Sequence, residues 1–126
     1  LEHLRIFTLS NVGDEALLTW LTGQEGLTSL THLRLDHNDL EGTSALAQLK
    51  DSAFATTLKT LSLTHTKLTN QGVAHLLGAL PSLTALTELD LSDNAIDARG
   101  LLPLVDLEPP AALTSLKLSG NALGRS

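Results

Sequence analysis

The chain of 126 residues is acidic, with 14 acidic side chains, 8 basic ones and a formal net charge of −6. This balance argues against nucleic acid or an anionic membrane as the main partner, and it favours basic partners. The chain has no cysteine, which excludes a disulfide framework and a thiolate metal site and fits a reducing compartment. No signal peptide and no run of 18 apolar residues is found, so we expect a cytoplasmic chain that does not enter a membrane.

The apolar part of the composition is mostly aliphatic, since 42% of the residues are hydrophobic and only 2% are aromatic. A core built mainly from leucine suits many small, similar layers better than one bulky centre. The sequence also begins inside a repeating pattern. We therefore expect residues 1–126 to form a single domain that is a segment of a longer protein.

The first stretch of the chain is the least regular. Leu1, Leu4 and Ile6 fit the spacing of inward-facing strand residues, which predicts a first strand over these positions. A second alignment is obtained by counting back one repeat from the next copy of the pattern. It differs by one residue from the alignment that Leu1, Leu4 and Ile6 set. A bulge between Ile6 and Val12 would reconcile the two alignments.

The rest of the chain alternates predicted helices and strands. Strands are expected at residues 32–36, 60–64, 88–92 and 115–119. Amphipathic helices are expected at residues 14–21, 44–50, 70–80 and 97–105. Pro81 should end the third helix, and hydroxyl or carboxylate side chains at Thr43, Ser44 and Asp97 can cap the starts of the others. Trp20, the only tryptophan, is expected to be buried where it closes one end of the fold.

One pattern, L-x-x-L-x-L-x-x-N-x-L, recurs through this alternation. Its copies begin at Leu30, Leu58, Leu86 and Leu113, at spacings of 28, 28 and 27 residues. Because alternate strand residues face opposite sides, the leucines point inward, and one repeat can bury them only against its neighbours. We expect an α/β solenoid shaped as a horseshoe arc, with about five parallel strands on the concave face and helices on the convex face.

The asparagine of the pattern stands at Asn38, Asn94 and Asn121, where its amide can bond the backbone of the turn, and Thr66 replaces it in one copy. These copies resemble the leucine-rich repeat superfamily, and the 28-residue period with helices resembles its ribonuclease-inhibitor-like class. The resemblance implies binding of another protein through the concave face, as in ribonuclease inhibitors, innate-immune receptors and activators of the GTPase Ran. The absence of cysteine and the uniform period depart from the ribonuclease-inhibitor pattern.

The outward-facing strand positions form columns across the repeats. Aligning the first strand as above places His3 beside His32, Arg5 beside Arg34, Phe7 beside Asp36 and Thr8 beside His37, with a basic edge at Arg5 and Arg34. An acidic patch is expected from Asp36, Glu88, Asp90 and Asp93. The face is either simply solvated or a partner-binding surface, and in the second case we expect the contacts at His32, Arg34, Asp36, His37, Ser62, Thr64, His65, Glu88, Asp90, Asp93 and Lys117.

His37, His65 and Asp93 fall in one column on successive repeats, which is a conceivable zinc set. Equal spacing follows from the repeat itself, however, and no second shell of residues supports a site. The same residues are too exposed on a strand face for tuned acid–base chemistry, and no catalytic sequence motif is found. We therefore predict no metal, no cofactor and no enzymatic activity.

The sequence favours a protein–protein interaction module. One alternative is a fragment of a Ran-type GTPase-activating regulator, with which the acidic patch is compatible. The other is a structural spacer or assembly repeat, which could self-associate because neither end of the solenoid has an obvious polar cap.

Overall fold

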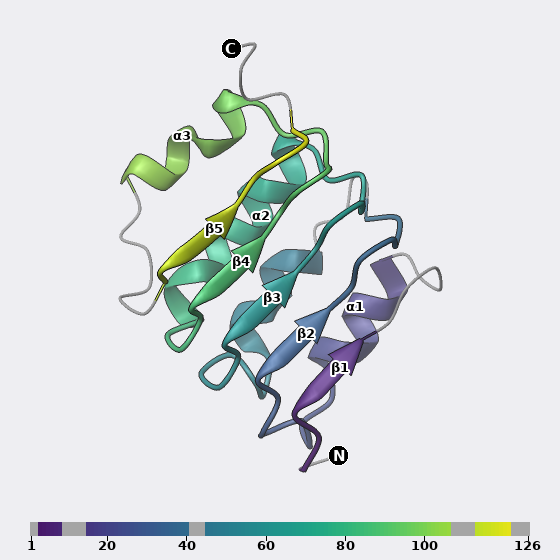
Figure 1. The fold of residues 1–126 in the computed structure, drawn as a ribbon. Helices are drawn as coiled ribbons and strands as arrows, with labels where there is room; N and C mark the ends of the chain where they lie inside the picture. Colours follow the sequence, from purple (N-terminus) through teal and green to yellow (C-terminus); the bar gives the residue numbers. More distant parts are fainter. Residues whose placement is uncertain (1–2, 9–14, 41–44, 107–112, 122–126) are drawn as a thin grey trace.

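The computed structural model describes residues 3–8, 15–40, 45–106 and 113–121. They form an open sheet of five parallel strands in sequence order, as Figure 1 shows. The strands are β1 (Ile6–Thr8), β2 (His32–Arg34), β3 (Thr60–Ser62), β4 (Glu88–Asp90) and β5 (Ser115–Lys117). The fold class predicted from the repeat is confirmed.

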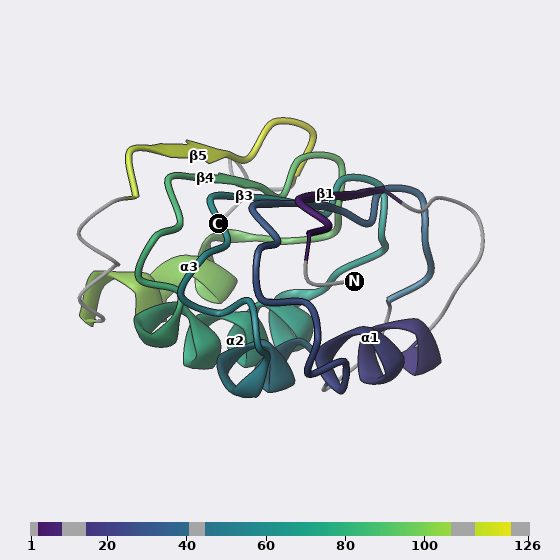
Figure 2. The same ribbon diagram turned by 90° about the horizontal axis from the view of Figure 1, so that it is seen from below.

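Helices form a second layer against one face of the sheet (Figure 2). They are α1 (Glu15–Thr22), the 3-10 helix η1 (Ala45–Asp51), α2 (Asn70–Ala79), the 3-10 helix η2 (Leu80–Ser82) and α3 (Ala98–Asp106). Pro81 lies inside η2, so regular α-helical structure ends at Ala79, close to the predicted stop. No helix in the described part of the chain is long and apolar enough to cross a bilayer.

The core lies between the two layers and is built almost entirely from leucine. In each strand the central residue faces the helices, and Leu33, Leu61 and Leu89 are buried there with at most 1% of their surface exposed. Leu46 and Leu49 of η1 and Phe54 complete the packing from the helical side, as predicted. Each layer therefore hides the leucines of the next one, which a single repeat could not do.

The first strand does not lie where the sequence pattern placed it. Ile6 pairs with His32 and Thr8 pairs with Arg34, so the predicted alignment is wrong by three residues. Phe7, not a leucine, takes the inward position in this layer, and Ile6 is 62% exposed. The predicted alignment of His3 with His32 and of Arg5 with Arg34 is therefore wrong, and so is the basic edge that this alignment implied.

The physical reason for this shift is that Leu4 and Phe7 keep the three-residue spacing of the leucines that begin the other copies, and both pack against the core. The Arg5 carbonyl accepts bonds from the N–H groups of Thr31 and His32, at 2.8 and 2.9 Å, which fixes the register. The bulge expected between Ile6 and Val12 falls largely on residues 9–14, outside the described residues.

Trp20 lies in this first layer, with its ring centroid 6.5 Å from that of Phe7. The indole remains 49% exposed. The prediction that Trp20 is buried is therefore wrong, because no further layer covers its outer side within the described residues.

The predicted structural role of the asparagines is confirmed. Asn94 Nδ2 donates to the Leu63 and Leu91 carbonyls, while its Oδ1 accepts from the N–H groups of Thr66 and Leu68. One side chain thus joins two successive turns. Thr66, which replaces asparagine, bonds its own turn through an Oγ1–Leu63 carbonyl contact of 2.8 Å.

Candidate functional site

The sheet face that the helices leave uncovered is called the strand face below. Because side chains alternate along a strand, the residues on either side of each buried leucine point out of this face. The strand register aligns them in two columns. These are Ile6, His32, Thr60, Glu88 and Ser115 in the first, and Thr8, Arg34, Ser62, Asp90 and Lys117 in the second.

A polar hollow of about 180 Å³ lies on the strand face. It forms because β3 carries only short hydroxyl side chains, whereas the flanking strands carry longer charged ones. The lining residues are Arg34, Asp36, Thr60, Ser62, Thr64, Glu88, Asp90 and Lys117. The hollow therefore has hydroxyl groups at its floor and charges at its walls.

The wall on the β4 and β5 side contains an ion pair. Lys117 Nζ lies 2.9 Å from Glu88 Oε1. The hydrogen bond and the charge of Glu88 raise the pKa of Lys117 above its ordinary value, and the nearby charge of Asp90 acts in the same direction. Lys117 is therefore a cation that is paired with Glu88 in this wall.

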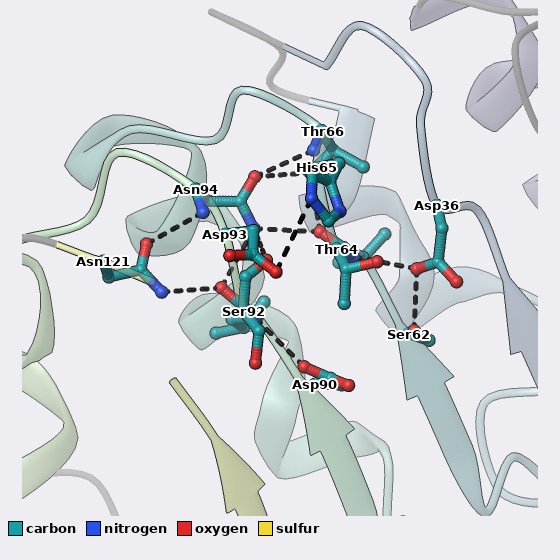
Figure 3. Close-up of polar contacts among 12 residues, drawn as sticks. Asp36, Ser62, Thr64, His65, Thr66, Asp90, Ser92, Asp93, Asn94 and Asn121 are labelled. Atoms are coloured by element: carbon teal, nitrogen blue, oxygen red, sulfur yellow. Dashed lines mark hydrogen bonds and ion pairs between the residues drawn. The ribbon is translucent and has the colours of Figure 1, made fainter. Parts of the chain in front are cut away.

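Two carboxylates are held in fixed orientations by backbone N–H groups (Figure 3). Asp36 Oδ1 accepts from the Ser62 hydroxyl at 2.7 Å and from the Thr64 N–H at 2.8 Å. Asp90 Oδ1 accepts from the Ser92 N–H at 3.0 Å. These bonds join Asp36, which follows β2, to the end of β3 and the residues after it, and they join Asp90 of β4 to the turn that follows β4. They restrict the rotamers of both carboxylates.

A sequence profile of the leucine-rich repeat family matches residues 26–47, 54–77 and 82–105, which is more than half of the chain. The chain belongs to the leucine-rich repeat family. A comparison with curated proteins gives no match. Leucine-rich repeats generally mediate protein–protein interaction, and the family is typically a non-enzymatic binding module. The narrower ribonuclease-inhibitor-like class stays a prediction.

Of the residues predicted for the site, this leucine-rich repeat domain brings seven together around the hollow: Arg34, Asp36, Ser62, Thr64, Glu88, Asp90 and Lys117. Thr60 also lines the hollow but was not among the predicted contacts. His32 lies outside the hollow, where its Nδ1 is 2.8 Å from the Thr31 hydroxyl.

The predicted acidic patch is divided in the leucine-rich repeat domain. Asp36, Glu88 and Asp90 line the hollow. Asp93 lies beyond it in the turn after β4, where its Oδ2 is 3.6 Å from His65 Nε2 (Figure 3).

The column of His37, His65 and Asp93 has a backbone explanation. These residues have φ angles of 61°, 55° and 59°, and Gly120 at the same place in the next repeat has 74°. Histidine, aspartate and glycine tolerate this left-handed conformation better than most residues. The position thus selects these residue types without any ligand.

The geometry of this column also differs from that of a metal site. The rings of His37 and His65 are stacked, with centroids 4.5 Å apart and planes inclined by 14°. Parallel rings present their faces to each other, whereas a shared ion needs their nitrogens to converge. The described residues contain no group of three or more metal-ligating side chains suited to hold an ion.

Proposed function

We propose that this leucine-rich repeat domain binds another protein through the strand face. The single observation that carries the proposal is the polar hollow of about 180 Å³, whose lining residues come from four successive repeats. Helices cover the opposite face of the sheet (Figure 2). The strand face is therefore the surface on which a partner could reach several repeats at once.

The energetics of the hollow favour binding over a purely solvated role. Fixing Asp36 and Asp90 through backbone N–H groups costs rotamer freedom during folding, before any partner arrives. A partner that meets fixed charges loses less entropy than one that must order flexible side chains. Preordered charges of both signs also select against partners of the wrong charge pattern.

A charge-matched pair of variants tests this function. In the first, Arg34, Glu88 and Asp90 of the strand face are changed to alanine. The control removes one basic and two acidic exposed side chains elsewhere, with Lys50→Ala, Glu25→Ala and Asp51→Ala. Wild type and both variants are used to capture partners from an extract of the source cells.

The proposal expects proteins that bind the wild type and the control variant but not the strand-face variant. Circular dichroism must show that all three chains are equally folded. If the strand-face variant retains every partner of the wild type, the strand face is not the binding surface.

A second candidate function is self-association through the β1 end of the solenoid. The observations that favour it are the exposed fractions of Ile6, 62%, and Trp20, 49%, beside an edge strand. An edge strand offers unpaired backbone groups that another chain could extend. Light scattering over a range of concentrations tests it: Ile6→Ser should weaken any dimer, and a monomer at every concentration refutes it.

A further inference from the structure

The hollow on the strand face has the size of one side chain. Its volume of about 180 Å³ is below the roughly 300–1,000 Å³ of typical small-molecule sites. The floor is formed by Thr60 and Ser62 of β3, which are short, and the walls by charged residues of the strands on either side. A single long side chain of a partner therefore fits better than a cofactor or a helix.

The charge of the hollow favours a cation. Three carboxylates and two cationic groups line it, and one of the cations, Lys117, is already paired with Glu88 at 2.9 Å. The remaining charged groups of the lining are the carboxylates of Asp36 and Asp90 and the guanidinium of Arg34. Arg34 forms no ion pair with any residue in the described part of the chain.

Asp36 and Asp90 flank β3 from opposite sides, since one belongs to the β2 repeat and the other to β4. Each binds protein donors through Oδ1, and within the described residues neither Oδ2 accepts a bond. The two carboxylates lie diagonally across β3, because Asp90 is level with Ser62 in the strand register whereas Asp36 bonds the Thr64 N–H two residues further along. The two carboxylates thus line the gap over β3 from opposite sides, and the Ser62 hydroxyl lies between them.

We propose that the partner protein inserts an arginine side chain into this gap, between Asp36 and Asp90. The inference rests on the proposed function of the strand face and names the group that is recognised there. A planar guanidinium carries donors on opposite edges, so it can donate to two separate carboxylates at once. A lysine ammonium is a compact point charge that reaches one carboxylate well and the other poorly.

The effect of removing Arg34 on binding affinity distinguishes a cationic partner group from an anionic one. The charge of Arg34 lies on the wall of the hollow and repels an incoming guanidinium. Removal of Arg34 should therefore strengthen the binding of a cationic group, whereas removal of Asp36 or Asp90 should weaken it. An anionic partner group would produce the opposite pattern in all three variants.

The experiment uses the 126-residue chain labelled with 15N and a pentapeptide with one central arginine, acetylated and amidated so that arginine is its only charge. A peptide with citrulline in place of arginine has nearly the same shape without the charge, and a glutamate peptide reverses the charge. The arginine peptide should shift the amide resonances of Thr64 and Ser92, because their N–H groups bond the two carboxylates. The other two peptides should leave these resonances in place.

The variants Asp36→Asn and Asp90→Asn keep the side-chain shape and the Oδ1 acceptor. Each should weaken the arginine peptide about tenfold, the loss expected for one charge-assisted bond. Arg34→Ala should tighten it severalfold. Asp51→Asn on the exposed surface of η1 makes the same chemical change on the helical layer and should leave the affinity unchanged.

Equal shifts with the citrulline peptide, no shift up to the solubility of the arginine peptide, or wild-type affinity in Asp90→Asn would each overturn the arginine inference. Such a result is distinct from failure of the proposed function. If the strand-face triple variant still fails to capture a partner that the wild type binds, the strand face binds that protein through a group other than arginine. If the triple variant captures every partner of the wild type, the proposed function fails as well.

Discussion

The amide of Asn94 joins two repeats, so its removal should measure how strongly successive layers hold each other. In the variant Asn94→Ala, the N–H groups of Thr66 and Leu68 lose the Oδ1 acceptor that they bond at 2.9 and 3.1 Å. The carbonyls of Leu63 and Leu91 lose the Nδ2 donor at 2.9 and 3.0 Å.

These losses are not equal in free energy. The Leu63 carbonyl also accepts from Thr66 Oγ1 at 2.8 Å, and the Leu91 carbonyl also accepts from Asn121 Nδ2 at 2.9 Å, so both keep a partner. The two N–H donors have no other protein acceptor in the described residues. An unsatisfied buried donor costs about 1–3 kcal/mol. Because Asn94 is half-buried and water can partly compensate, we expect the free energy of unfolding to fall by about 2–4 kcal/mol.

The assay is urea unfolding followed by circular dichroism, with the free energy of unfolding extrapolated to water. The control is Gln71→Ala, which removes an exposed amide of α2 and should change the free energy by less than about 0.5 kcal/mol. If Asn94→Ala falls within this same small range, the inter-repeat bonds do not stabilise the stack and the reasoning is wrong.

Three further predictions concern the helical layer and the core. Gly100→Ala should destabilise the fold by about 1–3 kcal/mol in urea unfolding, because a methyl group there collides with Asn70 Oδ1; Gly78→Ala, in open space on α2, should instead stabilise it by about 0.5–1 kcal/mol. Equal effects of the two changes would contradict the packing. The Asn70 amide and nearby backbone N–H groups hold the pKa of Asp97 below its ordinary value. This carboxylate therefore stabilises the fold above its unfolded-state pKa and loses that contribution as the pH falls below about 4. Asp97→Asn should accordingly reduce the acid sensitivity of the urea midpoint, and an unchanged pH profile would count against this assignment. Leu61→Ala, at the fully buried centre of β3, should cost about 2–5 kcal/mol and is measured in the same way; a loss below about 1 kcal/mol would mean that the layer repacks.

The sequence alone was sufficient for the architecture of the regular repeats. Leucines at a 28-residue period can leave water only by stacking in parallel layers, which set the order and direction of β2 to β5. The positions of Asn94 and Asn121 followed from the same periodicity. These features are local or repetitive, so they can be read from residue types and spacing.

The register of β1 could not be read in this way. Phe7 stands where the other copies have leucine, and the nearby Leu4 and Ile6 offered a second alignment with similar apolar spacing. Only the pairing of Ile6 with His32, together with the bonds to the Arg5 carbonyl, distinguishes the two. Pairing with a neighbouring layer is a long-range property that a single degenerate repeat does not encode.

Both the sequence and the tertiary structure were needed to find the candidate site. The sequence identified the outward columns and thereby most residues of the hollow. The hollow itself exists because short side chains on β3 lie between longer ones on β2 and β4, and because backbone N–H groups of the following turns orient Asp36 and Asp90. The left-handed backbone at His37, His65 and Asp93 likewise explains residue types that looked like ligands. Side-chain length, hydrogen-bond direction and φ acquire their meaning only when residues 28 positions apart are brought side by side.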